Sequence, residues 1–160
     1  MIEIKAPESY ADYSKMNAVF LAGSIEMGKA VDWQAEVAKN LADQDILILN
    51  PRRDDWDSSW EQSINHPQFR EQVEWELNAL ERADTILMYF APETMAPITL
   101  LELGIYAKSH PEKMIVCCPT GFWRKGNVDI VCNMYGVRQV EGLERLIETV
   151  GQENACNTLR

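Results

Sequence analysis

Short apolar runs that alternate with segments of helical period are the feature that most constrains the fold of this chain. Runs such as Ala18 to Ala22 and Thr85 to Phe90 carry no charge, as strands buried on both faces do. Their alternation with helical segments predicts parallel strands joined by crossover helices, and hence a three-layer α/β sandwich. The expected strands span residues 18–22, 46–49, 85–90, 114–118 and 137–140, and the expected helices 32–42, 67–82, 97–108, 128–134 and 143–150.

The length of 160 residues predicts one domain with a central sheet of about five strands. Residues 1–16 and 152–160 fall outside the alternating pattern, and we expect them to be loosely ordered. The first residues lack the layout of a signal peptide, and no apolar run approaches the length that spans a membrane.

Charge limits the range of partners. The chain carries 15 Lys and Arg against 25 Asp and Glu, a formal net charge of -10, so a polyanion meets net repulsion. Nucleic-acid polymers and anionic membranes are therefore not expected to bind. A small solute is still compatible with this charge, because a local pair such as Arg52 and Arg53 could hold one phosphate.

The cysteines indicate a reducing environment. Cys117 and Cys118 lie inside an apolar run, where adjacent thiols are typical of small buried side chains in the cytoplasm. The chain has no C-x-x-C pair and only two histidines, so we expect neither a metal site nor a metal cofactor.

The loop after the first expected strand is close to a phosphate-binding loop. Gly23 to Lys29 fits the spacing G-x-x-x-x-G-K. However, Ala30 stands where a hydroxyl would bind magnesium, and Glu26 would place a negative charge within the loop. We therefore favour a turn that glycine permits over a triphosphate-dependent kinase.

One carboxylate falls on a helix that is otherwise almost entirely apolar. In the expected helix 97–108, Thr99, Glu102 and Tyr106 form a narrow polar strip. Because an isolated buried charge is costly, Glu102 must be paired, hydrogen-bonded or functional. An ion pair with an arginine such as Arg124 and a catalytic role are equally good interpretations of this pattern.

A second glutamate, Glu76, lies near the apolar stripe of the expected helix 67–82. That stripe consists of Phe69, Val73, Leu77 and Leu80. Two carboxyls that point inward can divide labour, one ionised and the other protonated. Such a pair suits cleavage of a bond to an anomeric carbon, where positive charge develops on the sugar. The alternative for Glu76 is a side chain at the rim of the stripe.

Loops and element ends supply further candidate contacts. Trp56 and Trp60 could stack on a heterocyclic base or cap the core. Asn127 could donate to a ligand or cap the helix that follows it. Asp84 is expected to make local hydrogen bonds at a helix-to-strand junction. Arg52 could hold a phosphate or balance the acidic residues of its own loop.

Four segments carry a family resemblance. They are Phe20-Leu21-Ala22-Gly23-Ser24-Ile25, Ala83-Asp84, Leu101-Glu102-Leu103-Gly104 and Gly126-Asn127-Val128. Together they resemble the nucleoside 2-deoxyribosyltransferase-like family, which includes 5′-monophosphate N-glycosidases. The resemblance implies a flavodoxin-like fold and cleavage of the N-glycosidic bond of a nucleoside or nucleotide, with no cofactor.

The resemblance also implies roles for individual residues. Glu102 acts as the nucleophile on the anomeric carbon, and Glu76 falls where relatives have an aspartate that contacts the base. Gly23, Ser24 and Ile25 match the loop that holds the sugar or the 5′-phosphate. The expected site comprises Glu102 and Glu76 as catalytic residues and Gly23, Ser24, Ile25, Arg52, Trp56, Trp60, Asp84 and Asn127 as substrate contacts. The resemblance further implies a homo-oligomer in which a neighbour completes the site.

Three departures from the family pattern keep the function open. Ala96 stands where relatives have a side chain that holds the sugar, Val19 replaces a tyrosine expected near the nucleophile, and Glu76 is longer than the usual aspartate. Sugar transfer to another nucleobase is favoured. Hydrolysis of nucleoside 5′-monophosphates and nucleotide binding without catalysis are the alternatives.

Overall fold

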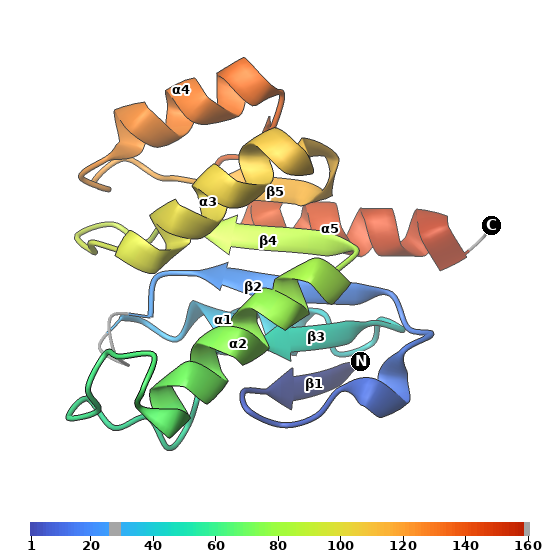
Figure 1. The fold of residues 1–160 in the computed structure, drawn as a ribbon. Coiled ribbons are helices and arrows are strands. Elements are labelled where there is room, and N and C mark those ends of the chain that lie inside the picture. Colours follow the sequence, from blue (N-terminus) through green and yellow to red (C-terminus); the bar gives the residue numbers. More distant parts are fainter. Residues whose placement is uncertain (26–29, 159–160) are drawn as a thin grey trace.

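A single sheet of parallel strands forms the centre of the protein, with helices on both faces (Figure 1). The computed structural model describes residues 1–25 and 30–158, the last four of them by their backbone only. Within these residues the strand order is β1-β3-β2-β4-β5-β6. The strands are β1 (Ile2–Lys5), β2 (Ala18–Gly23), β3 (Leu47–Asn50), β4 (Thr85–Tyr89), β5 (Met114–Cys117) and β6 (Arg138–Gln139). The α-helices are α1 (Trp33–Asn40), α2 (Pro67–Arg82), α3 (Pro97–Ser109), α4 (Lys125–Tyr135) and α5 (Leu143–Thr158), and short 3₁₀ helices span Ala11–Tyr13 and Pro111–Lys113.

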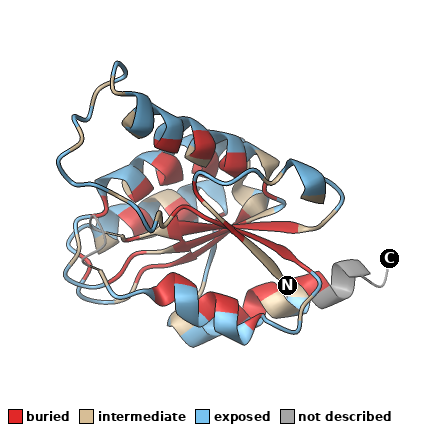
Figure 2. Cartoon of the chain, turned by 90° about the horizontal axis from the view of Figure 1, so that it is seen from below, coloured by how far each residue is buried: buried red, intermediate tan, exposed pale blue. Residues whose placement is uncertain are grey.

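Two apolar layers hold the helices to the sheet. Helices α2, α3 and α4 cover one face, and α1 and α5 cover the other. Side chains of a strand alternate between these layers: Phe20 packs towards α2 and α3, and its neighbour Leu21 packs towards α1 and α5. Burial on both faces explains the uninterrupted apolar runs of the inner strands β2 to β5, and Figure 2 shows most of the sheet as buried.

The predicted three-layer α/β fold is confirmed, with one strand more than expected. The expectation of loose order over residues 1–16 is wrong for Ile2–Lys5, because β1 pairs in parallel with β3 from Ile2↔Leu47 to Lys5↔Asn50. The expectation for residues 152–160 is also wrong as far as Thr158, since α5 continues to that residue. Helix α2 has the predicted bounds.

The strand order defines where a ligand is expected. Apart from β1, the order β3-β2-β4-β5-β6 is that of flavodoxin-like proteins. After β2 the chain continues to β3, towards one edge of the sheet, and after β4 it continues to β5, towards the opposite edge. The strand order therefore reverses between the neighbouring strands β2 and β4. Ligands in such sheets bind beyond the carboxyl ends of the strands at the point of reversal.

Helices α2 and α3 present apolar side chains to the outside. On α3, Ile98, Leu101 and Ile105 are exposed, Leu101 by 60%, although the sequence suggested a helix buried almost all round. On α2, Val73 and Leu77 are also exposed, so the predicted apolar stripe is only partly buried. We call these five residues the α2–α3 apolar face. The strip Thr99, Glu102 and Tyr106, in contrast, is buried.

No helix in the described part of the chain is long and apolar enough to cross a bilayer.

Candidate active site

Ser24 connects the two strand ends at the point where the strand order reverses. Its side chain is buried after β2, and its Oγ accepts a hydrogen bond from the backbone N–H of Ala91, which follows β4 (3.0 Å). The Thr94 hydroxyl donates to the Ala91 carbonyl (2.8 Å), so the Ser24 hydroxyl donates to Thr94 Oγ1 (2.7 Å). The hydroxyl of Ser24 is therefore engaged within the protein. Its contact with a ligand stays a prediction.

Gly23 allows the close packing behind Ser24. A Cβ atom at position 23 would lie 2.5 Å from Trp33 Cζ2 and 2.5 Å from the carbonyl oxygen of Tyr89. The indole N–H of Trp33 donates to the Ser24 carbonyl (3.1 Å), which holds the loop against α1. The half-buried Ile25 continues this loop, and its carbonyl accepts the N–H of Ala30. Residues 26–29, which hold the rest of the P-loop-like segment, lie outside the described residues.

Glu102 is a buried carboxyl in the second turn of α3, with 7% of its surface exposed. Among the described residues, no hydrogen bond or ion pair reaches its carboxyl group. The sequence offered Arg124 as a partner, but the guanidinium of Arg124 lies over the ring of Trp123, 4.2 Å from its centroid. Burial raises the pKa of Glu102 well above its usual range, and the charge of Glu76 raises it further.

Glu76 is the second carboxyl of this site. It lies on α2, partly buried, and its Oε1 accepts a hydrogen bond from Gln72 Nε2 (2.8 Å). Gln72 Nε2 also donates to the carbonyl of Pro51, directly after β3 (2.8 Å). Burial raises the pKa of Glu76 from 4.5 to about 7, although the bond from Gln72 opposes this shift. Glu76 thus lies near the carboxyl end of β3, and its carboxyl interacts with that of Glu102, so that both have raised pKa values.

The arginines of the β3 loop contact protein groups. Arg52 donates to the carbonyl of Ala30 (3.2 Å) and lies 3.5 Å from the carboxylate of Asp32, so it ties this loop to the loop after β2. Arg53 forms ion pairs with Asp55 (2.6 Å) and Glu71 (3.0 Å). Acidic side chains of this loop and of α2 thus balance the charge of Arg53.

The tryptophans of the same loop pack on each other. The rings of Trp56 and Trp60 meet edge to face, with centroids 5.2 Å apart, and Trp60 also contacts the ring of His66 and the guanidinium of Arg53. The indole N–H of Trp56 is buried and has no hydrogen-bond partner in the described part of the chain. The loop therefore has a side-chain cluster of its own at the carboxyl edge of the sheet.

Two further expected contacts are Asp84 and Asn127. Asp84 begins the approach to β4, at the amino edge of the sheet, where its Oδ2 accepts hydrogen bonds from the N–H of Ala18 (2.8 Å) and from Arg82 (3.2 Å). This is the local role that its junction position predicted. Asn127 is exposed in the first turn of α4, which begins at Lys125, so it does not cap a helix starting at Val128.

Val19 and Ala96, the two residues that differ from the family pattern at these positions, lie in different parts of the fold. Val19 packs in the layer with α1 and α5, on the face of the sheet opposite α3. The expectation that position 19 lies near the nucleophile is therefore wrong. Ala96 is buried at the start of α3 with a left-handed backbone (φ 42°), and its own methyl side chain has no group that could cap the helix.

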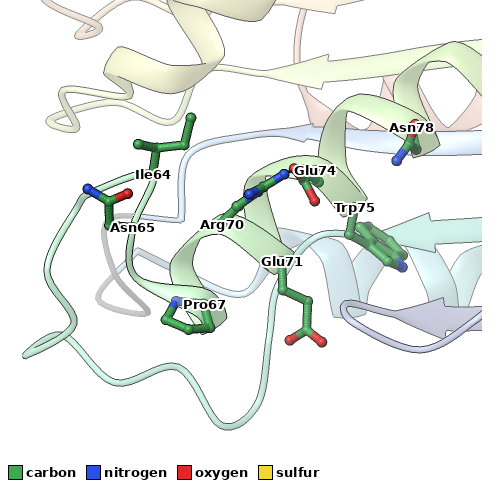
Figure 3. Close-up of a pocket in the computed structure, with 8 residues that line it drawn as sticks. All are labelled: Ile64, Asn65, Pro67, Arg70, Glu71, Glu74, Trp75 and Asn78. Atoms are coloured by element: carbon green, nitrogen blue, oxygen red, sulfur yellow. The ribbon is translucent and has the colours of Figure 1, made fainter.

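Two surface cavities lie away from the carboxyl pair. One, of about 630 Å³, runs along the outer side of α2 beside Arg70, Glu74 and Trp75 (Figure 3). The other, of about 560 Å³, lies beyond β5 and β6 beside Lys125 and Asp129. None of their lining residues is a predicted site residue.

Two residues that the sequence did not single out hold the site together. Thr94 completes the bridge between β2 and β4, and Gln72 connects Glu76 to the β3 loop. The signal for Gln72 was its position four residues before Glu76, which places both on one side of a helix.

Fold and carboxyl pair together define a class: flavodoxin-like α/β proteins with an acidic site near the carboxyl edge of the sheet. The sequence profile described as "Nucleoside 2-deoxyribosyltransferase like" matches residues 16–122, about two thirds of the chain. The protein belongs to this family. Among curated proteins, none matches the chain.

Proposed function

We propose that the protein cleaves the N-glycosidic bond of a nucleoside or deoxynucleoside and transfers the sugar to another nucleobase. One observation carries this proposal: the carboxyls of the buried Glu102 and the partly buried Glu76 interact, and no cation of the described residues forms an ion pair with either. A pair kept partly protonated at neutral pH is suited to nucleophilic attack with proton transfer to a leaving group.

In the first half-reaction, Glu102 is the nucleophile and Glu76 the general acid. The free protein keeps its last shared proton on Glu102, because burial opposes ionisation there most strongly. When substrate binds, this proton passes to Glu76, directly or through a water molecule. The Glu102 carboxylate then attacks C1′, and an ester bond forms. The C1′–N bond breaks, its electron pair stays on the base, and the base takes the proton from Glu76.

The second half-reaction reverses these steps with a new acceptor. Glu76, now ionised, takes a proton from the acceptor base as its nitrogen attacks C1′. The ester bond to Glu102 breaks, and the Glu102 carboxylate leaves with its electron pair. If water is the acceptor, the same steps give hydrolysis and a free sugar.

We assign the contacts with the base and the sugar to residues of the loops and of the start of α4. The tryptophan cluster supports stacking of the base by Trp56 or Trp60 at the edge of the site. Gly23, Ser24 and Ile25 line the path to the sugar from the β2 side, and Asn127 contributes from the exposed start of α4. We do not assign Asp84 to the substrate, because its carboxylate bonds at the amino edge of the sheet.

Partners of the basic residues favour a nucleoside over a 5′-monophosphate. Arg52 and Arg53 form ion pairs with acidic side chains, and Lys125 pairs with Asp129 (3.0 Å). Arg124 stacks on Trp123. A phosphate would have to compete with these contacts. Hydrolysis of 5′-monophosphates is therefore the second choice.

We also propose that the protein acts as a homo-oligomer in the cytoplasm. The α2–α3 apolar face supports self-association, because exposed apolar patches of this kind mark interaction surfaces. Cys117, Cys118 and Cys132 are buried free thiols, which supports a reducing compartment.

A substrate panel tests the function. The protein is incubated with nucleosides and 5′-monophosphates, with and without an acceptor base, and products are separated by chromatography. Transferase action gives a new nucleoside only when acceptor is present, whereas hydrolase action gives free base in water alone. Binding without turnover would contradict both reactions and would favour a nucleotide-binding module.

A further inference from the structure

Gln72 lies between the β3 loop and the proposed general acid. Its side chain is on the inner side of α2, with only 4% of its surface exposed. One nitrogen, Nε2, donates both to the carbonyl of Pro51 and to Oε1 of Glu76, each at 2.8 Å. The backbone at the end of β3 is thereby linked to the catalytic carboxyl through a single amide group.

The backbone fixes the orientation of this amide. A carbonyl oxygen only accepts hydrogen bonds, so the group facing Pro51 must be the NH₂. The opposite orientation would place two oxygens, Gln72 Oε1 and the Pro51 carbonyl, against each other. In the observed orientation Oε1 is buried and has no hydrogen-bond partner among the described residues. Because an unpaired buried acceptor is unfavourable, the contacts of Nε2 must hold the amide in place.

We propose that Gln72 is a positioning residue, which confines the transferable proton of Glu76 to Oε2 and directs that oxygen to the leaving base. Oε1 of Glu76 always faces an N–H group, so it acts as an acceptor in every state of the cycle. A proton on Glu76 must then reside on Oε2. This inference rests on the proposed function, in which Glu76 carries the proton between Glu102 and the base.

The surroundings leave this role to Gln72. From α3, the Glu102 carboxyl interacts with Glu76, whose charge raises the pKa of Glu102, and the Tyr106 hydroxyl donates to Glu81 on α2 (2.6 Å). From the β3 loop, Arg52 is held by Asp32 and Ala30. The bond from Gln72 is the contact that favours ionised Glu76 and opposes the effect of burial.

Gln72→Met tests the proposal, because methionine has similar length and no N–H donor. Loss of a hydrogen bond to a charged group should lower kcat by about tenfold or more, with a much smaller change in KM. The pH below which kcat falls should rise by about one unit, because Glu76 loses the hydrogen bond that favours its ionised form. Gln68→Met is the matched control, since Gln68 is exposed on the same helix, and it should leave both quantities unchanged. A variant with reduced thermal stability but an unchanged pH dependence of kcat would show a merely structural role and overturn the proposal.

NMR spectroscopy provides a second test that needs neither activity nor a folded variant. In the ¹⁵N-labelled wild type, the side-chain NH₂ signals of Gln72 should shift between pH 5 and 9 with the midpoint of Glu76, about 7. Signals that do not move over this range would overturn the inference. If the panel of substrates gives no turnover but these signals titrate, the proposed function fails and the link between Gln72 and Glu76 stands.

Discussion

Burial raises the pKa of the Glu102 carboxyl on α3, and the charge of Glu76 on α2 raises it further. The two groups therefore titrate as a pair, because the charge of ionised Glu76 opposes ionisation of Glu102. The protonation of these two carboxyls should therefore affect both the stability of the fold and the proposed reaction.

Glu102→Gln should lower the rate of base release by at least about a thousandfold, because an amide does not form the glycosyl ester. Chromatography of the products with the best substrate of the panel measures this rate. Glu74→Gln is the control, since Glu74 is exposed on α2 in an ion pair with Arg70. A Glu102→Gln variant with more than about a tenth of wild-type activity contradicts the assignment of the nucleophile.

The pH profile of kcat/KM should fall below about pH 7, where Glu76 becomes protonated. Protonated Glu76 cannot take the proton of Glu102, so kcat/KM should fall about tenfold for each further unit by which the pH is lowered. Initial rates from pH 5 to 9 in buffers of constant ionic strength provide the profile. A rate that keeps rising towards pH 5 would be incompatible with this role of Glu76.

Glu76 should make the fold less stable as pH rises from 4.5 to 7. In this window the folded protein keeps a proton that the unfolded chain has lost, because the pKa of Glu76 is raised from 4.5 to about 7. The loss amounts to about 3 kcal/mol. Glu76→Gln removes it, so the stability of this variant relative to wild type should rise by about 3 kcal/mol across the window. Urea unfolding at both pH values measures the difference, with the exposed Glu61→Gln as control. If the free energy of unfolding changed equally between the two pH values for Glu76→Gln and wild type, the raised pKa of Glu76 would be contradicted.

Gly23→Ala and Gly104→Ala should have opposite effects on stability. At position 23 the added methyl group would overlap Trp33 and the Tyr89 carbonyl, which predicts a loss of roughly 1–3 kcal/mol. At position 104, an exposed site inside α3, it meets no atom within 4 Å and should add roughly 0.5–1 kcal/mol. Thermal unfolding of the two variants compares them directly. Equal effects would show that the packing around Gly23 adjusts.

Leu101→Glu should dissociate the proposed oligomer, because it places a charge in the middle of the α2–α3 apolar face. Sedimentation velocity across a range of concentrations measures the assembly state. Ile64→Glu alters an equally apolar, exposed residue outside this face and should leave the assembly intact. A wild-type protein that sediments as a monomer at all concentrations contradicts the proposal.

The sequence was most informative where both faces of an element are buried. The inner strands β2, β3, β4 and β5 come from continuous apolar runs, so their positions could be predicted to within a residue or two. Strand β1 was missed because Glu3 and Lys5 alternate with isoleucines, a pattern typical of an edge strand with one solvated side. Its pairing with β3 is a long-range contact that no local pattern indicates.

Burial of the candidate site could be predicted only in part. The polar strip with Glu102 was identified from its spacing, but which side of α3 faces the sheet was not, since apolar side chains occupy both sides. The role of Gln72 depends on the position of the Pro51 carbonyl, a backbone group that sequence spacing does not locate. Likewise, Val19 lies on the opposite face from α3 because of the alternation of side chains along β2.

Strand β1 has a practical consequence for the design of fragments. The segment that matches the family profile begins at residue 16, after β1 has already covered the outer edge of β3. A fragment trimmed to that segment would leave the N–H and C=O groups on the outer edge of Leu47–Asn50 without a pairing strand, although β2 still pairs with the inner edge. Unpaired strand edges promote pairing between molecules, so such a fragment should aggregate in expression trials while the chain of 160 residues stays dispersed.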